Sequence, residues 1–316
     1  MQHPATRNPV RARGIKYRLT RILMDNWQLY ALLLPAVAAI YLFKYLPLSG
    51  IQIAFREFRM GKAFDSGAWV GLKYFERFFN NFWAGTVIKN TVILSAVVRI
   101  IEWPFPILLG VMLHNCLNLR VRKFAQTATY IPYLISVVVV VSLLQIILGR
   151  ESGLVNILLA RLGGESINFF GEERWFFPVF VISELWQGVG FGAIIYLAAL
   201  SSIDQEMSEA ALIDGASRLQ KVWYIDLPSI APTIITMLIL RCGRMFQLGP
   251  DKILLMQTPL NLGASEIIST YVYKTGVLQM QYGFSTAIGL LNNVVNFAIM
   301  LTVNQIAKRY SDTAIL

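Results

Sequence analysis

Charged side chains inside apolar stretches are the residues of this sequence with the clearest capacity for chemistry. Arg99 and Glu102 lie three positions apart in one stretch, Glu184 lies in a second, and Arg241 and Arg244 lie three apart in a third. A charge at the centre of a membrane helix costs about 2.5–3.5 kcal/mol on insertion scales, so such residues usually face a cavity or a partner. The spacing of Arg99 and Glu102 predicts that they pair with each other on one helix.

The two arginines of the third stretch have no carboxylate close to them in sequence. On a helix, Arg241 and Arg244 share one face. A guanidinium can hold a carboxylate through two parallel hydrogen bonds, so this pair is suited to binding an anion. The alternative is structural, with the arginines neutralised by Glu184 on the preceding apolar stretch or by an acid on a partner subunit.

An acidic insert, residues 203–228, separates two apolar stretches and reads as a helix, a tight turn and a second short helix. It holds five acidic and two basic residues, although the whole chain has a formal charge of +10. Asp204 is suited to cap the first helix, and Gly215 can take the positive φ that ends it. Ala210 and Ala211 present almost no side chain beside the carboxylate of Glu209. The insert is therefore predicted to dock against another surface.

Composition indicates a membrane protein that crosses the bilayer several times. Of the 316 residues, 56% are hydrophobic and only 15% are charged, and the mean hydropathy is +0.55. Soluble domains carry about 25% charged residues, which excludes an ordinary soluble protein with an oversized core. The Lys and Arg residues cluster beside the apolar stretches, as the positive-inside rule requires, rather than in a nucleic-acid-binding pattern. Cys116 and Cys242 offer no disulfide framework.

Six predicted spans define an all-α architecture, since about 20 apolar residues cross the hydrocarbon core as a helix. They cover residues 27–48, 88–114, 124–148, 174–202, 229–249 and 284–307. We expect three parts: a basic cytoplasmic segment 1–26, a transmembrane domain 27–310 that contains the loop 203–228, and a tail 311–316. The first apolar stretch is too long for a signal-peptide core and is expected to be retained. Parity places both termini and the acidic insert in the cytoplasm.

The insert resembles the EAA signature of permease subunits in binding-protein-dependent ABC importers. Glu209-Ala210-Ala211, three residues, Gly215, nine residues, Ile225, one residue and Leu227-Pro228 reproduce EAA-x3-G-x9-I-x-LP. The resemblance implies a coupling helix that seats in a cleft of a separate ATPase, with Glu209, Ala210, Ala211, Asp214 and Gly215 as the docking element. The chain has no G-x-x-x-x-G-K-[ST] phosphate loop of its own.

The same resemblance implies the partners of this chain. We expect a second homologous permease, two ATPase subunits that bind ATP and Mg²⁺, and a solute-binding protein outside the membrane. No cofactor is expected in this chain, which we interpret as a transport subunit of a bacterial inner membrane and not as an enzyme.

Cargo is predicted from a narrower resemblance. "YLPLSGIQIAFREF", "WVGLKYFERFF" and "IIYLAALSSIDQEMSEAALIDGAS" are similar to the LplB-like polysaccharide permease branch, which implies oligosaccharide or polysaccharide cargo. Arg241 and Arg244 depart from the small or amide residues typical of that branch, and we interpret them as a site for anionic cargo such as uronic-acid oligosaccharides. The expected path also includes Glu184, Trp186, Gln187, Gly188 and Phe191, because aromatic and amide side chains suit sugars. The spacing of Gly188 and Gly192 also predicts a close helix contact.

Two other functions compete with this interpretation. An ion-gradient-driven sugar transporter would titrate Glu102 or Glu184. A membrane-embedded enzyme acting on lipid-linked sugars would need a catalytic constellation. The only histidines, His3 and His114, have no metal-ligand spacing, and no serine or aspartate has a histidine base beside it.

Overall fold

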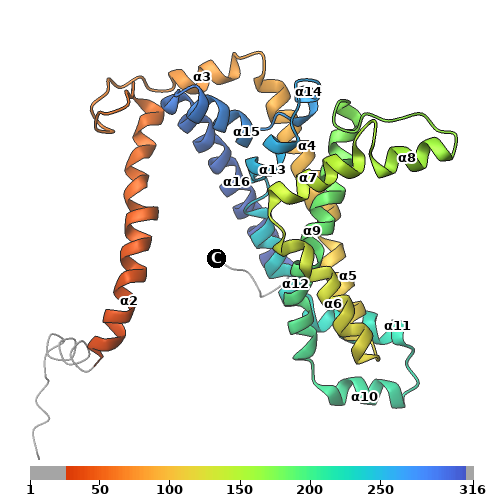
Figure 1. The fold of residues 1–316 in the computed structure, drawn as a ribbon. Coiled ribbons are helices and arrows are strands. Elements are labelled where there is room, and N and C mark those ends of the chain that lie inside the picture. The colour runs from red at the N-terminus through yellow and green to blue at the C-terminus, as the bar shows by residue number, and fades with distance from the viewer. Residues whose placement is uncertain (1–25, 311–316) are drawn as a thin grey trace, which may run out of the picture.

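The computed structural model describes residues 26–310 of the chain. The predicted tail 311–316 and all but Asn26 of the predicted segment 1–26 lie outside the described residues. Helices make up most of what is described, which confirms the expected all-α class (Figure 1). The helices are α2 (Trp27–Ile40), α3 (Lys73–Phe79), α4 (Ala84–Glu102), α5 (Pro104–His114), α6 (Leu119–Leu134), α7 (Val137–Leu148), α8 (Leu154–Arg161), α9 (Glu173–Ser201), α10 (Gln205–Ile213), α11 (Arg218–Lys221), α12 (Leu227–Cys242), α13 (Pro250–Met256), α14 (Leu262–Ser265), α15 (Ile268–Tyr273) and α16 (Tyr282–Tyr310). A 3₁₀ helix, η2 (Leu46–Phe55), and three π-helical turns, η1 (Tyr41–Tyr45), η3 (Val222–Asp226) and η4 (Lys274–Leu278), complete them.

Within residues 26–310, five helical runs are long and apolar enough to cross a membrane. They are Trp27–Phe55, Ala84–His114, Glu173–Ser201, Arg218–Cys242 and Tyr282–Ile306. Each overlaps one of the six predicted spans. The second run is interrupted at Trp103, where Pro104 begins α5, because a proline nitrogen cannot continue the helical hydrogen bonds.

The predicted span 124–148 is broken into two helices, because the chain bends by 101° between α6 and α7. Pro132 lies in the last turn of α6, and Ile135 after it is extended, with φ −78° and ψ 133°. Ser136 then starts α7 as its N-cap, its hydroxyl accepting a hydrogen bond from the Val139 amide at 3.4 Å. The bent pair counts as a sixth span only if the two helices are taken together.

The predicted span 229–249 also ends early, since α12 stops at Cys242. Irregular backbone at membrane depth needs hydrogen-bond partners from the protein. Two amides of α16 supply them: Asn296 Oδ1 accepts from the Phe246 amide at 2.9 Å, and Asn292 Nδ2 donates to the Phe246 carbonyl at 3.4 Å. A side-chain ladder on α16 thus holds the non-helical segment that follows α12.

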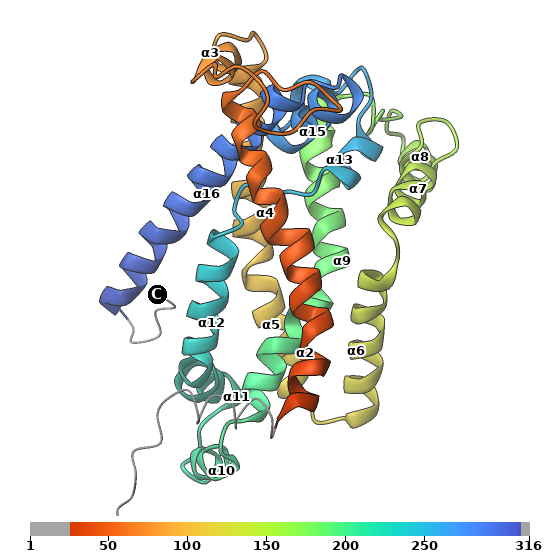
Figure 2. The same ribbon diagram turned by 90° about the vertical axis from the view of Figure 1, so that its left-hand side faces the viewer.

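The short helices lie at two opposite ends of the bundle. α10 and α11 lie at one end, and α3, α13, α14 and α15 lie at the other (Figures 1 and 2). The central helix is α9, which packs against α4, α5, α6, α12 and α14. α2 stands apart from the bundle in Figure 1, and none of its residues is buried by the described part of the chain.

Candidate functional site

The tip of the loop 203–228 has the predicted local structure. The Asp204 carboxylate caps α10 by accepting a hydrogen bond from the Glu206 amide at 3.0 Å. Gly215 follows the helix with φ +79°, a conformation that costs residues with a Cβ atom more than glycine. Ser217 and Gln220 form a capping box that starts α11. The predicted cap and the predicted positive φ are both confirmed.

The predicted docking residues lie at the free end of this loop. Glu209, Ala210, Asp214 and Gly215 are exposed and Ala211 is half-buried, and α10 contains no buried residue. Apolar side chains are exposed beside them, among them Met207, Leu212 and Ile213. Figure 1 shows α10 projecting from the bundle. The described chain therefore leaves uncovered a helix with two adjacent alanines, one central carboxylate and apolar neighbours.

Sequence reasoning missed a polar cluster at the base of the same loop. Asp226 is 0% exposed, and its Oδ2 accepts a hydrogen bond from Asn115 Nδ2 at 2.8 Å. Lys221 Nζ lies 3.5 Å from Asp226 Oδ1 and donates to Asn115 Oδ1 at 3.2 Å. Lys221 and Asp226 flank Val222–Ile225 within the EAA signature, so the sequence could have suggested that these two charges pair. No local pattern pointed to Asn115, which comes from a distant part of the chain.

The membrane charges form a cluster around one carboxylate. Glu102 Oε2 lies 3.2 Å from Arg99 Nη1 and 3.6 Å from Arg241 Nη1. The predicted pairing of Arg99 with Glu102 is confirmed. Arg241 has a carboxylate after all, supplied by the bend between α4 and α5 and not by a neighbour in sequence. Two guanidiniums share one carboxylate, so these three side chains carry a formal charge of +1.

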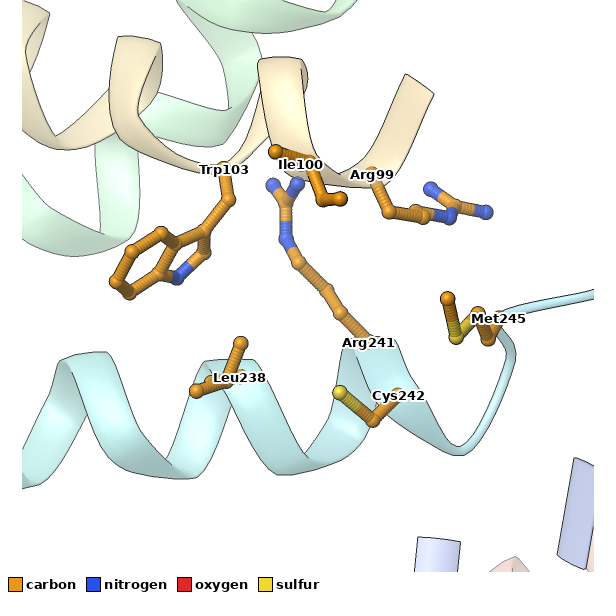
Figure 3. A pocket seen from close by; sticks show the side chains of 7 residues that line it. All are labelled: Arg99, Ile100, Trp103, Leu238, Arg241, Cys242 and Met245. Atoms are coloured by element: carbon orange, nitrogen blue, oxygen red, sulfur yellow. The ribbon is translucent and has the colours of Figure 1, made fainter. Parts of the chain in front are cut away.

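A cavity of about 320 Å³ lies against this cluster, between α12 and the end of α4. Its lining consists of Arg99, Ile100, Trp103, Leu238, Arg241, Cys242 and Met245 (Figure 3). Three buried donors at this cavity, namely Arg99 Nε, Trp103 Nε1 and Arg241 Nη1, have no hydrogen-bond acceptor among the described residues. A buried donor without an acceptor costs about 1–3 kcal/mol. A carboxylate matches the excess positive charge beside this cavity, whose exposed wall is otherwise largely apolar.

Arg244 does not share a helical face with Arg241, which corrects the prediction from spacing. Because α12 ends at Cys242, Arg244 lies in the turn that follows and is exposed. It forms no ion pair with the described residues, and it does not line the cavity of Arg241.

Glu184 and Gln187 do not neutralise the arginines and instead hold a buried lysine of α13. Lys252 is 5% exposed, and its Nζ lies 2.7 Å from Glu184 Oε1 and 3.2 Å from Gln187 Oε1. Gln187 also donates to the Ile135 carbonyl at 3.0 Å, at the bend between α6 and α7. These two side chains join three segments at the α13 side of the bundle.

The remaining predicted path residues lie on different faces of α9. Trp186 lines a second cavity, of about 280 Å³, beside α6. Phe191 stacks on Tyr133 of α6, with 3.9 Å between ring centroids. Gly188 faces the charged cluster, since a Cβ atom there would lie 3.3 Å from Glu102 Oε1. Arg241 and Gly188 thus lie at the charged cluster, whereas Trp186 and Phe191 face α6 instead.

The glycine spacing on α9 does mark a close helix contact. A Cβ atom at Gly192 would lie 3.1 Å from Pro106 Cγ of α5, which confirms the predicted approach. It would also lie 3.5 Å from Arg241 Nη2. Glycines at 188 and 192 therefore leave room for the charged cluster beside α9.

Known proteins resemble this chain in sequence and in fold. Residues 106–312 match the family described as the binding-protein-dependent transport system inner membrane component. Protein LplB of Bacillus subtilis (strain 168) is 37% identical over 298 residues, which cover 94% of this chain and 93% of that protein. The polygalacturonan/rhamnogalacturonan transport system permease protein YteP of the same organism is 37% identical over 314 residues, covering 99% and 98%. A solved chain of a bacterial ABC transporter involved in the import of the acidic polysaccharide alginate is 34% identical, with a TM-score of 0.86, and covers 93% of this chain and 100% of its own.

Proposed function

The chain belongs to the family of binding-protein-dependent transport system inner membrane components, and we propose that it is a permease subunit of an ATP-driven importer of acidic oligosaccharides. It pairs with a second, homologous permease and carries cargo delivered by a binding protein outside the membrane. Two ATPase subunits on the cytoplasmic side bind ATP and Mg²⁺. The ion-gradient alternative is set aside, because the family is defined by dependence on a binding protein.

The exposed α10 is the single observation that carries the coupling role. Beside Glu209, its small-residue patch is exposed at Ala210 and half-buried at Ala211, and no residue of α10 is buried by the described chain. Its end turn is fixed by Gly215. A short helix with a fixed turn and small residues can seat in a cleft of another protein without losing much conformational entropy.

Charge distribution supports a cytoplasmic position for α10 and α11. The end of the bundle that holds α10 and α11 also holds Arg120, Arg122 and Lys123 at the start of α6, as well as Arg218 and Lys221. Clusters of Lys and Arg in short loops favour the cytoplasmic side of a membrane. The end with α3, α8, α13 and α15 then faces outward.

The cargo proposal is supported by the cavity and by two relatives. The cluster of Arg99, Glu102 and Arg241 carries an excess positive charge and unpaired buried donors. YteP is named for polygalacturonan and rhamnogalacturonan, and the solved transporter is described as importing acidic alginate. Uronic acids present carboxylates, which guanidinium groups bind in pairs of hydrogen bonds.

The mechanism follows from two global states that bind different ligands. Closure of the ATPase pair on ATP draws the two coupling helices together and turns the cavity from inward-facing to outward-facing. Cargo leaves the binding protein, and its carboxylate meets Arg241 and Arg99. Hydrolysis of ATP separates the ATPases and returns the cavity to the cytoplasmic side, where the cargo dissociates.

Charge reversal in the docking helix tests the proposal. We expect Glu209→Lys to abolish ATP-dependent uptake of uronic-acid oligosaccharides by proteoliposomes that hold the complete complex, while membrane insertion is unchanged. Glu165→Lys, at an exposed carboxylate on the opposite end of the bundle, is the control and should transport normally. Wild-type uptake by Glu209→Lys would remove the docking role. Uptake that persists with inactive ATPase subunits and collapses with the proton gradient would restore the ion-driven alternative.

A further inference from the structure

We propose that Asn115, Lys221 and Asp226 form a buried polar clasp that transmits movement of the coupling loop to the cargo cavity. The inference rests on the coupling role proposed above and adds the residues through which force leaves the loop. All three side chains lie at the inner end of the bundle, where the loop 203–228 joins α12. None of them belongs to the docking patch on α10.

The polar atoms of the clasp are hydrogen-bonded except Asp226 Oδ1, which among the described residues has only its ion pair with Lys221. Asn115 Nδ2 donates to Asp226 Oδ2 at 2.8 Å and to the Val111 carbonyl at 3.1 Å, and its Oδ1 accepts from Lys221 Nζ at 3.2 Å. Lys221 Nζ lies 3.5 Å from Asp226 Oδ1. The side chains of Lys221 and Asp226 are 14% and 0% exposed. One amide therefore joins both charges to the end of α5.

A local departure from α-helix geometry builds this contact. Lys221 ends α11, and the π-helical turn η3 follows it up to Asp226. Hydrogen bonds in a π turn join residues five apart, as the Leu227 amide joins the Val222 carbonyl here. Lys221 and Asp226 are also five apart, so their side chains lie on one face and meet at Asn115. π turns inside helices are frequent at functional sites.

Stability alone gives no reason for these charges. Removing a buried ion pair from water costs several kcal/mol per ion, and well-packed apolar replacements are often neutral or stabilising. The surroundings are apolar, with Val111, Val222, Leu227 and Ile230 in the adjacent cluster. What a polar contact does fix is the relative position of two elements, because hydrogen bonds are directional while apolar contacts can slide. We infer that the clasp sets the register between η3 and α5.

The same two spans are joined a second time at the cargo cavity. The run Arg218–Cys242 meets the run Ala84–His114 through the clasp at one end and through Arg241 and Glu102 at the other. Asp226 and Arg241 are 15 residues apart, which is about 22 Å of helix. Glu102 and Asn115 are 13 residues apart, which is about 20 Å. Two polar links of matching separation make the two spans move as one body.

This frame connects the two proposed sites directly. A displacement of α10 and α11 moves Lys221 and Asp226, and through Asn115 it moves the end of α5. The rigid pair of spans then carries the displacement to the cluster of Arg99, Glu102 and Arg241. Without the clasp, the loop still docks on the ATPase, but apolar sliding at the base of η3 absorbs the movement.

A triple apolar variant, Asn115→Leu with Lys221→Met and Asp226→Leu, tests the clasp. Leucine has the branched shape of asparagine and aspartate with the same number of non-hydrogen atoms, and the variant leaves no buried charge without a partner. We measure co-purification with the ATPase subunits, the melting temperature of the complex, and oligosaccharide uptake per ATP hydrolysed in proteoliposomes. We expect assembly and melting to match wild type while uptake per ATP falls at least tenfold. The matched control replaces an exposed ion pair, Glu57→Gln with Lys73→Met, and should leave all three values unchanged.

The outcomes separate the clasp from the docking role. Glu209→Lys should lose association with the ATPase, whereas the triple variant should keep it. Wild-type uptake per ATP in the triple variant would overturn the clasp and leave the docking role standing. If the triple variant does not assemble, Asn115→Leu alone decides, since it keeps both charges and should lower uptake per ATP at least threefold. Failure of both variants to assemble would make the cluster a folding requirement and would equally overturn the proposal.

Discussion

Glu102 determines the charge of the cavity, because one of its oxygens holds two arginines. Arg99 reaches it from the same helix, and Arg241 reaches it from α12 at 3.6 Å. Gly188 of α9 lies on the other side of Glu102, and a Cβ atom there would be only 3.3 Å from Glu102 Oε1. The carboxylate is too small to satisfy both guanidiniums, so donors remain free for cargo. We interpret Glu102 as the counter-ion that lowers the cost of holding two arginines in the membrane when no cargo is bound.

Arg241→Gln tests this interpretation at the level of one side chain. The change leaves Arg99 and Glu102 as a neutral pair and removes the excess charge. A hydrogen bond to a charged group contributes about 1.5–3 kcal/mol, and each 1.4 kcal/mol is roughly tenfold in affinity. We expect uptake of an acidic oligosaccharide to weaken roughly ten- to hundredfold in apparent affinity, with little change for a neutral oligosaccharide of equal length. Competition between labelled acidic and neutral cargo measures the ratio.

Arg244→Gln is the matched control for that variant. Arg244 is exposed and lies outside the cavity that Arg241 lines. We expect its apparent affinity for acidic cargo to stay within about twofold of wild type, since a side chain without an ion pair contributes little to a distant site. Equal loss in the two variants would point to a general effect of positive charge. No loss in Arg241→Gln would remove this cluster from the cargo path.

For single helices, the sequence predicted the membrane spans but missed a break within one of them. Apolar length predicted where the spans lie, because length and hydropathy alone decide whether a helix can cross a bilayer. The 101° bend between α6 and α7 was missed, although Pro132 and Ser136 mark it. Both residue types are also tolerated inside membrane helices, where neighbouring groups satisfy the freed backbone. Residue type alone therefore does not distinguish a kinked helix from a broken one.

The candidate site was predictable to the extent that its geometry is local. The coupling loop has its cap, its glycine turn and its docking residues within twelve positions, and each prediction about its local structure was confirmed. The membrane charges pair over long separations, as Glu102 does with Arg241 and Glu184 with Lys252. One sequence does not tell which helices are neighbours. Spacing therefore gave Arg99 its partner, but it gave Arg241 no partner and wrongly placed Arg244 on the same helical face.

Substitution by alanine is predicted to lower the stability of the complex at Gly190 of α9 but not at Gly289 of α16. A Cβ atom at Gly190 would lie 1.9 Å from the Thr129 carbonyl oxygen, whereas a Cβ atom at Gly289 of α16 would meet nothing within 4 Å. Gly190→Ala must push α6 away from α9, and overpacking of this kind costs about 1–3 kcal/mol. Gly289→Ala should be neutral or stabilising, by up to about 1 kcal/mol, because alanine favours the helix. Melting temperatures of the purified complex measure both.

Results that contradict this packing are simple to recognise. A melting temperature for Gly190→Ala equal to wild type would mean that α6 and α9 do not approach as closely as their backbones do here. A large drop for Gly289→Ala would mean that another chain covers that face of α16. The second result would also map part of the interface with a partner subunit.

In the molecule as a whole, α2 is a membrane-length helix that the rest of the described chain does not cover. None of its residues is buried by the described part of the chain, and large apolar side chains such as Leu32 and Leu34 are 78% and 65% exposed. α2 continues through η1 and η2 as a run of 29 residues, long enough to cross the membrane. Lipid can cover such a helix, but it does not fix where the helix stands. A helix held away from its own bundle needs a protein surface to define its position.

We predict that the second permease subunit provides that surface. Cysteines placed singly at Leu29, Leu33 and Val37, which share one helical face, and labelled with a thiol-reactive photo-cross-linker should cross-link to the partner permease in a background lacking Cys116 and Cys242. Val139 on α7, which is 48% exposed, provides a control position that should give no such product. Gel mobility and mass spectrometry of the product identify the two chains. A helix that folded back onto its own bundle would instead give cross-links within one chain, to α15 or α16. Such products would leave the permease pair without this contact, because a helix that covers its own bundle has no surface left to offer a partner.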